Sequence, residues 1–283
     1  MSRALTAILD HVRAEPSRTW SIIVTIYGDA IVPRGGSVWL GTLSAFFRAL
    51  DISDGVVRTA MSRLASDGWL ERTKVGRNSY YRLAEKGRET FQQATSHIYS
   101  QNAPAWAGHF DMLLAENGAR GALEAAGFGS PAPGVWIAPG GVPVPVEADG
   151  ALRLRAGGDD AANRALAARA WALEATGEAY ARFLDAFSPL RAAVLGGQTL
   201  SDLDCLVGRV LLIHEYRRIV LRDPILPAEV LPADWPGAAA RALCAEVYGA
   251  LLEGSERWLD ENAVDESGAP LPPSDEVWRR FKG

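Results

Sequence analysis

Four side chains that can bind phosphates and base edges are spaced so that one helix would hold them together. Arg58, Thr59, Ser62 and Arg63 fall at positions i, i+1, i+4 and i+5, which share a helical face. Guanidinium groups pair with phosphate oxygens and guanine edges, and hydroxyl groups can bond to any base. The pattern therefore indicates a surface that contacts double-stranded DNA, although a solvated helix face alone can look the same.

The rest of this predicted helix is apolar and has clear ends. The inward face consists of Val56, Val57, Ala60, Met61, Leu64 and Ala65. Ser53 or Asp51 is the expected N-cap, and Ser53 is also a candidate DNA contact. Gly68 supplies the left-handed residue that commonly ends a helix.

A short basic hairpin is predicted directly after this helix. Residues 69–75 and 79–83 are rich in β-branched and aromatic residues, and residues 76–78 between them form a turn signal. The candidate DNA contacts of this hairpin are Lys74, Arg77, Asn78 and Ser79. From residue 53 to residue 82 there are six Lys or Arg and three Asp or Glu, an excess that favours counterion release from DNA. The order of helix, glycine, strand, basic turn and strand predicts a winged helix-turn-helix.

The preceding residues supply the expected framework of such a domain. A first helix from Ser17 would place Trp20, Ile23, Val24 and Tyr27 on one face and end at Gly28. Residues 38–40 are suited to the small strand that completes the wing, and residues 42–50 to a second helix. After Leu83 we expect an exit helix, followed by a linker at residues 100–104.

The length and charge distribution predict more than one domain. The chain has 283 residues, 48% of them hydrophobic, and a formal charge of −5. Residues 1–100 hold 13 basic and 9 acidic residues (+4), and the remainder holds 16 and 25 (−9). A basic first third followed by an acidic remainder is typical of a DNA-binding domain joined to a part of the chain that senses a ligand or mediates assembly.

Few features point to export or to a membrane. The two cysteines, Cys205 and Cys244, sit in apolar helical patterns and are expected to be buried thiols in a reducing cytoplasm. No signal peptide or membrane span is predicted, and no cofactor is expected.

Two further units are predicted downstream. A strand at 109–114, a helix at 118–126 and a strand at 135–138 indicate a small α+β domain. Beyond it the pattern is helical, with a start at Ser201, an apolar stripe to about Leu221, and another helix after Pro236.

Polar residues cluster around the end of the first of these helices. Candidate ligand-binding residues are His214, Arg217, Arg218, Asp223 and Trp235. They can form a pocket, or they can form a buried ionic network that joins the helix end to a proline-rich loop.

These stretches together resemble the PaaX family of bacterial repressors of phenylacetic acid catabolism. The matching segments are RTAMSRLASDGWL with VGRNSYY, then GFGSPAPGVWIAP, then HEYRRIVLRDPILPAEVLPADWPG. The resemblance implies a mainly α protein with α+β parts. Its domains would be a winged helix-turn-helix with exit helix at 1–100, a ferredoxin-like middle domain at 105–157 and a helical effector and dimerisation domain at 158–283.

The resemblance also implies a ligand: an acyl-coenzyme A thioester, phenylacetyl-CoA in the best-known members, whose binding releases DNA. Arg217 and Arg218 would suit its phosphates. We therefore expect a cytoplasmic, homodimeric repressor that binds a two-fold symmetric operator.

Two other functions are considered. A nonspecific architectural protein would bind DNA with little sequence preference. An enzyme acting on acyl-CoA is disfavoured because His214 and Glu215 point about 100° apart on a helix, and because no nucleophile elbow, HExxH, P-loop or GxGxxG motif occurs.

Overall fold

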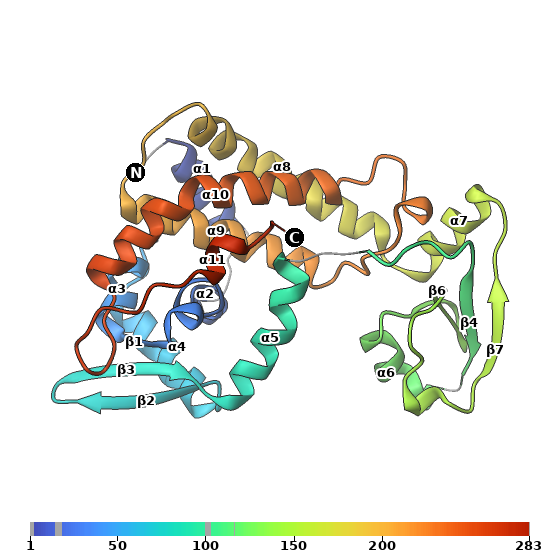
Figure 1. The fold of residues 1–283 in the computed structure, drawn as a ribbon, viewed down its shortest axis with the longest axis horizontal. Helices are drawn as coiled ribbons and strands as arrows, with labels where there is room; N and C mark the ends of the chain where they lie inside the picture. The colour runs from blue at the N-terminus through green and yellow to red at the C-terminus, as the bar shows by residue number, and fades with distance from the viewer. Residues whose placement is uncertain (1–2, 15–18, 100–102, 116, 283) are drawn as a thin grey trace. The chain divides into compact units, whose positions relative to one another are not determined.

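The computed structural model describes residues 3–14, 19–99, 103–115 and 117–282 (Figure 1). The chain forms two compact units, each assembled from separate segments. Unit 1 contains residues 1–100, 182–221 and 239–283, and unit 2 contains residues 101–181 and 222–238. Segments that are far apart in the sequence therefore belong to the same unit. The predicted domain boundaries at 105, 157 and 158 stay a prediction. The linker expected at 100–104 lies largely outside the described residues, as does Pro16.

The amino-terminal part of unit 1 is a set of short helices that leads to one strand. Its elements are α1 (Arg3–Ala14), α2 (Thr19–Ile26), the π-helical turn η1 (Tyr27–Ile31), the 3-10 turn η2 (Val32–Arg34), β1 (Ser37–Trp39) and α3 (Leu40–Arg48). The apolar side chains of α3 are buried as predicted, including Phe46 and Phe47, whose rings meet edge to face at 5.1 Å.

Two expectations for α2 were wrong. The chain does not leave helical conformation at Gly28, because η1 continues through it. A Cβ on Gly28 would overlap the ring of Phe91, so this ring packs directly against the backbone of η1. Trp20 is 42% exposed and does not belong to the buried face.

Helix α4 (Asp54–Ser66) and the hairpin β2 (Leu70–Val75) and β3 (Asn78–Leu83) follow the predicted order. Val57, Met61 and Leu64 face the core, whereas Val56 is 48% exposed, so the apolar face is narrower than predicted. Ser53 occupies the N-cap position without a side-chain capping bond. Gly68 has a φ of 74°, as expected for the residue that ends the helix.

The hairpin belongs to a three-stranded antiparallel sheet with strand order β1-β3-β2. Pairing of Val75 with Asn78 leaves Gly76 and Arg77 as the two-residue turn, and Gly76 has the positive φ of 58° that such turns require. Helix α5 (Glu85–Tyr99) follows the sheet as the predicted exit helix.

The carboxyl-terminal helices complete unit 1. They are the later part of α8 (Leu173–Leu195), α9 (Asp202–Val220), α10 (Gly237–Asn262) and α11 (Glu276–Arg279). Ser201 caps α9 by accepting a hydrogen bond from the amide of Asp204, as its sequence predicts. Both cysteines are buried, as expected.

Unit 2 is built on a four-stranded antiparallel sheet. Its strands are β4 (Phe110–Leu114), β5 (Gly129–Ala132), β6 (Val135–Pro139) and β7 (Leu152–Ala156), in the order β5-β6-β4-β7. Helix α6 (Arg120–Ala125) joins β4 to β5, as in a ferredoxin-like β-α-β-β unit. Between β6 and β7, the 3-10 turn η4 (Val146–Ala148) stands where a second helix would be. Strands β5 and β7 were not predicted.

Helices cover part of this sheet. Phe110 and Ile137 pack in one cluster with Ala167 of α7 (Asp160–Ala170) and with Val230 of the turn η5 (Ala228–Val230). The prediction of a mainly α protein with α+β parts is confirmed. No described helix is long and apolar enough to cross a lipid bilayer.

Candidate nucleic-acid interface and adjoining cavity

The polar face of α4 is open to solvent. Arg58, Thr59, Ser62 and Arg63 are all exposed, and the side chain of Arg63 is 77% exposed. The Thr59 hydroxyl donates to the carbonyl oxygen of Gly55 at 2.9 Å, which fixes its rotamer. Burial of the opposite face positions this row of donors, because Val57, Met61 and Leu64 cannot leave the core without losing their packing.

An ion pair connects the start of α4 to the helix before it. Nε and Nη2 of Arg48 in α3 donate to the two carboxylate oxygens of Asp54, at 2.9 and 2.6 Å. The same guanidinium lowers the pKa of Asp54. This forked contact connects α3 to α4 at an exposed position.

The tip of the hairpin is exposed at three of its four candidate residues. Lys74, Arg77 and Asn78 are open to solvent. Ser79 is instead buried, and its hydroxyl oxygen accepts hydrogen bonds from Nε and Nη2 of Arg72 at 3.2 and 2.8 Å. Ser79 therefore links β3 to β2 through Arg72. Arg72 is a further exposed cation, and it lies on β2.

The base of the hairpin sheet is attached to the segment after α10. The Arg82 guanidinium pairs with Glu266 at 2.7 Å, and the Trp39 amide donates to the carbonyl oxygen of Val264 at 3.0 Å. Since these contacts join both β1 and β3 to residues 264–266, the hairpin is held by the carboxyl-terminal part of unit 1 and not by its turn alone.

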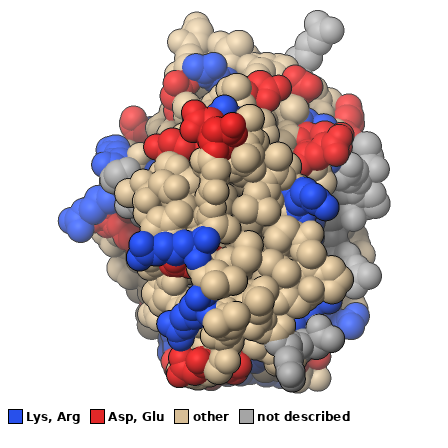
Figure 2. Space-filling view, turned by 90° about the vertical axis from the view of Figure 1, so that its right-hand side faces the viewer, with Lys and Arg blue, Asp and Glu red and all other residues tan. Residues whose placement is uncertain are grey.

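Positive charge is not spread evenly over the protein. Figure 2 shows one face on which basic and acidic side chains are interspersed and broad areas carry no charge. A face of this kind lacks the continuous positive stripe that tracks a phosphate backbone. The exposed donors of α4 and of the hairpin stay the predicted DNA contacts.

The five predicted effector residues are divided between the units. His214, Arg217 and Arg218 belong to unit 1, and Asp223 and Trp235 belong to unit 2. Asp223 accepts hydrogen bonds from the Tyr180 hydroxyl at 2.7 Å and from the Ile225 amide at 2.8 Å. The Trp235 ring packs edge to face on Tyr180, with centroids 5.9 Å apart. These contacts lie within unit 2 and contain no ion pair, so both interpretations of the set stay predictions.

The three residues on α9 have different surroundings. His214 is fully buried, its Nδ1 lies 2.9 Å from the Thr25 hydroxyl, and burial with the charges of Arg217 and Arg218 lowers its pKa to about 3. Arg218 pairs with Glu215 at 3.1 Å. His214 is thus a neutral core residue, and the effector role of the set stays a prediction.

Arg217 crosses from α9 to α2. Its Nε donates to the Thr25 hydroxyl oxygen at 2.8 Å, and its Nη2 donates to the carbonyl and hydroxyl oxygens of Ser21 at 3.0 and 2.8 Å. Burial and the nearby Arg218 charge lower the pKa of Arg217 to about 10. A buried guanidinium bonded to neutral oxygens retains a strong preference for an anionic partner.

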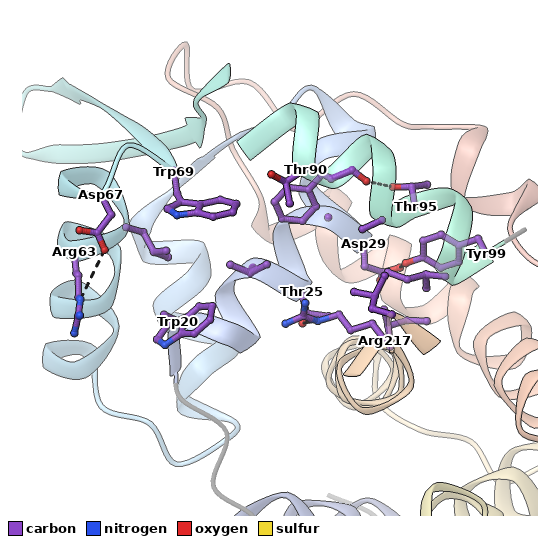
Figure 3. Close-up of a pocket in the computed structure, with 18 residues that line it drawn as sticks. Trp20, Thr25, Asp29, Arg63, Asp67, Trp69, Thr90, Thr95, Tyr99 and Arg217 are labelled. Carbon is purple, nitrogen blue, oxygen red and sulfur yellow. Dashed lines mark hydrogen bonds and ion pairs between the residues drawn. The ribbon is translucent and has the colours of Figure 1, made fainter. Parts of the chain in front are cut away.

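Arg217 lies on the wall of a cavity of about 460 Å³ within unit 1 (Figure 3). The cavity is bounded by α2, α4, α5, η1 and α9. Four aromatic side chains line it, namely Trp20, Trp69, Phe91 and Tyr99. Figure 3 shows Trp20 and Trp69 toward one end, and Asp29, Tyr99 and Arg217 toward the other.

The end of the cavity at Asp29 rests on a buried ionic network. Asp29 is fully buried, with Arg209 Nε at 2.7 Å and Arg280 Nη1 at 2.7 Å, and it accepts a hydrogen bond from the Tyr99 hydroxyl at 2.7 Å. Arg209 continues to Glu256 at 2.6 Å, and Arg34 pairs with the same carboxylate at 2.8 Å. The network ties η1 to α9, α10 and the carboxyl-terminal segment.

Sequence reasoning missed both the cavity and the network. The cavity residues belong to α2, η1, α4, α5, α9 and the turn before β2, so no single stretch of the sequence shows them together. Arg209 offered a signal, because it is a lone cation within the apolar run from Leu206 to Ile213. Its partner Asp29 is 180 residues away, so the pairing could not be read from spacing.

Comparison with known proteins gives consistent results over the whole chain. Residues 18–87 match the family model described as PaaX-like protein, and residues 171–261 match the PaaX-like protein C-terminal domain. The transcriptional repressor PaaX of Escherichia coli (strain K12) is 33% identical over 303 aligned positions, which cover 100% of this chain and 96% of that protein.

A solved structure is also similar. The uncharacterized protein Rv0674 from Mycobacterium tuberculosis superposes with a TM-score of 0.52 and 26% sequence identity. The match covers 77% of this chain and 90% of the mycobacterial chain.

Proposed function

The chain belongs to the PaaX family of transcriptional repressors, and from this premise we propose that it binds operator DNA through α4 and the β2–β3 hairpin and leaves it when an acyl-CoA binds. The observation that carries the proposal is the exposure of Arg58, Ser62 and Arg77 on a framework whose other faces are buried. An inward orientation of these three side chains would have excluded it.

The parts of the interface have different tasks. Helix α4 enters the major groove of a winged helix-turn-helix complex, where Ser53, Arg58, Thr59, Ser62 and Arg63 meet base edges and phosphates. Lys74, Arg77 and Asn78 contact the sugar-phosphate backbone beside that groove. One such helix reads few base pairs, so the repressor acts as a homodimer on a two-fold symmetric operator.

The effector in this proposal is an acyl-coenzyme A thioester, and phenylacetyl-CoA is the first candidate. Support for it comes from the family resemblance. The decisive experiment is a gel shift of operator DNA with a panel of CoA thioesters. Release by phenylacetyl-CoA but not by CoA is the expected result, and retention of DNA with every thioester would contradict the effector assignment.

Two controls separate this function from its alternatives. A repressor should prefer its operator over random duplex by roughly 10³-fold or more, whereas equal competition by random duplex would indicate an architectural protein. The thioester should be recovered intact after incubation, because its turnover would indicate an enzyme.

A further inference from the structure

The cavity beside α4 has the composition of a ligand site. Its volume of about 460 Å³ falls in the range of small-molecule pockets, about 300–1,000 Å³. Trp69 and Phe91 offer ring surfaces, and Leu64 and Ile98 add aliphatic ones. A flat aromatic group placed there would remove apolar surface from water and could pack against these rings in offset or edge-to-face geometry.

Charged residues border the cavity at both ends (Figure 3). Arg63 and Asp67, 3.8 Å apart, lie at the end with Trp20 and Trp69, and Asp29 and Arg217 lie at the other. The Asp29 carboxylate is offset by Arg209 and Arg280, so it does not present a free negative charge. Arg217 donates only to hydroxyl and carbonyl oxygens in the hydrogen bonds described above, and Thr25 lies beside it. This end of the cavity therefore favours a carbonyl or carboxylate oxygen over a cationic group.

We propose that this cavity binds a flat aromatic acyl group, with the ring between the side chains of α2 and α5 and the acyl oxygen facing Arg217. The inference rests on the proposed function in that the occupant is taken to be the effector. The cavity is apolar along most of its walls, and burying phosphates in it would be unfavourable. The nucleotide part of a thioester therefore stays outside it.

The position of the cavity explains how its occupant would act on DNA binding. Leu64 lies in the cavity wall on the buried face of α4, and Arg63, the residue before it, is largely exposed and also borders the cavity. Trp69 lines the cavity immediately before β2. A ligand that contacts Leu64 and Trp69 would shift α4 and the β2–β3 hairpin from the side opposite the DNA. The spacing between the helix and the hairpin would then no longer fit a duplex.

A filled cavity tests the proposal. Ala94 lines the cavity from α5, and Ala94→Phe places a ring in the ligand volume without removing a polar contact. Gln92 is exposed on the same helix and does not line the cavity, so Gln92→Phe is the matched control. Leu221→Phe fills the cavity from the end of α9 and serves if Ala94→Phe fails to fold.

Binding is measured by isothermal titration calorimetry of the full chain with phenylacetate, phenylacetyl-CoA and CoA. We expect wild type and Gln92→Phe to bind an aromatic probe equally, and the filled variants to bind it at least about tenfold more weakly, a difference of about 1.4 kcal/mol. Binding of phenylacetate identifies a free acid as sufficient, whereas binding of the thioester alone shows that the CoA part is also needed. CoA alone should bind wild type and filled variants alike.

Operator affinity without ligand is measured in parallel by fluorescence anisotropy and should be unchanged in the control variant Gln92→Phe. Equal affinity of wild type and filled variants for the aromatic probe would overturn the inference, as would no binding of either aromatic probe to wild type. Both results leave operator binding intact, so they are distinct from failure of the proposed function, in which wild type does not select its operator.

Discussion

Replacing Asp29 with asparagine should destabilise unit 1 far more than the same replacement at the surface. Asp29 is fully buried between the guanidinium groups of Arg209 and Arg280, each 2.7 Å from a carboxylate oxygen. The amide keeps the volume but removes the negative charge, and both cations stay buried. Breaking a buried ion pair in this way is unfavourable by about 3–5 kcal/mol, a large share of the 5–15 kcal/mol that typically holds a domain together.

The control is Glu246→Gln, which removes the carboxylate of an exposed pair with Arg191. Exposed pairs contribute about 0–1 kcal/mol, so the control should unfold close to wild type. The assay is urea unfolding followed by far-ultraviolet circular dichroism, with the stability difference taken from the midpoints at constant slope. If Asp29→Asn lost no more stability than Glu246→Gln, the claim that the buried ion pairs of Asp29 stabilise unit 1 would be refuted.

The remaining predictions concern DNA contacts, pH and the effector. Arg77→Ala should weaken binding to all duplexes and reduce the salt slope by about 0.9 per protomer, whereas Ser62→Ala should change sequence preference; identical behaviour of the two across an operator library would contradict the division of roles. His214 has its pKa lowered to about 3, so the unfolded chain binds more protons than the folded one below about pH 6.5 and stability falls as the pH drops through this window. Wild type should lose about 2 kcal/mol more than His214→Asn between pH 7 and pH 5 in calorimetric unfolding, and equal losses would place the acid sensitivity elsewhere. Arg217→Met should weaken operator release by the effector and leave operator affinity unchanged, whereas Arg222→Met, at an exposed position outside the cavity wall, should release normally; gel shifts that reverse this order would remove Arg217 from the ligand site.

The elements of the proposed DNA-binding part could be predicted because the signals for them are local. The three-and-four spacing of Val57, Met61 and Leu64 places them on one helical face wherever the helix is packed. Gly68 and Gly76 take the left-handed conformations that only glycine adopts at little cost, so they mark a helix end and a turn from sequence alone.

The same local reasoning failed where packing depends on distant residues. Val56 and Trp20 are apolar and correctly spaced, but the structure leaves them 48% and 42% exposed. Ser79 looked like a tip residue, but Arg72 on the partner strand takes up its hydroxyl. Periodicity shows which side chains share a helical face. It does not show how much of that face the neighbouring elements cover.

By itself, the sequence determined the order of helices and strands from α3 to β3, the exposed donors of α4 and the turn of the hairpin, since these depend on residues a few positions apart. Only the tertiary structure decided that Asp29 pairs with Arg209 and Arg280, and that Trp69, Phe91 and Arg217 surround one cavity. These contacts join residues far apart along the chain, and their formation depends on how helices pack, which no short-range spacing encodes.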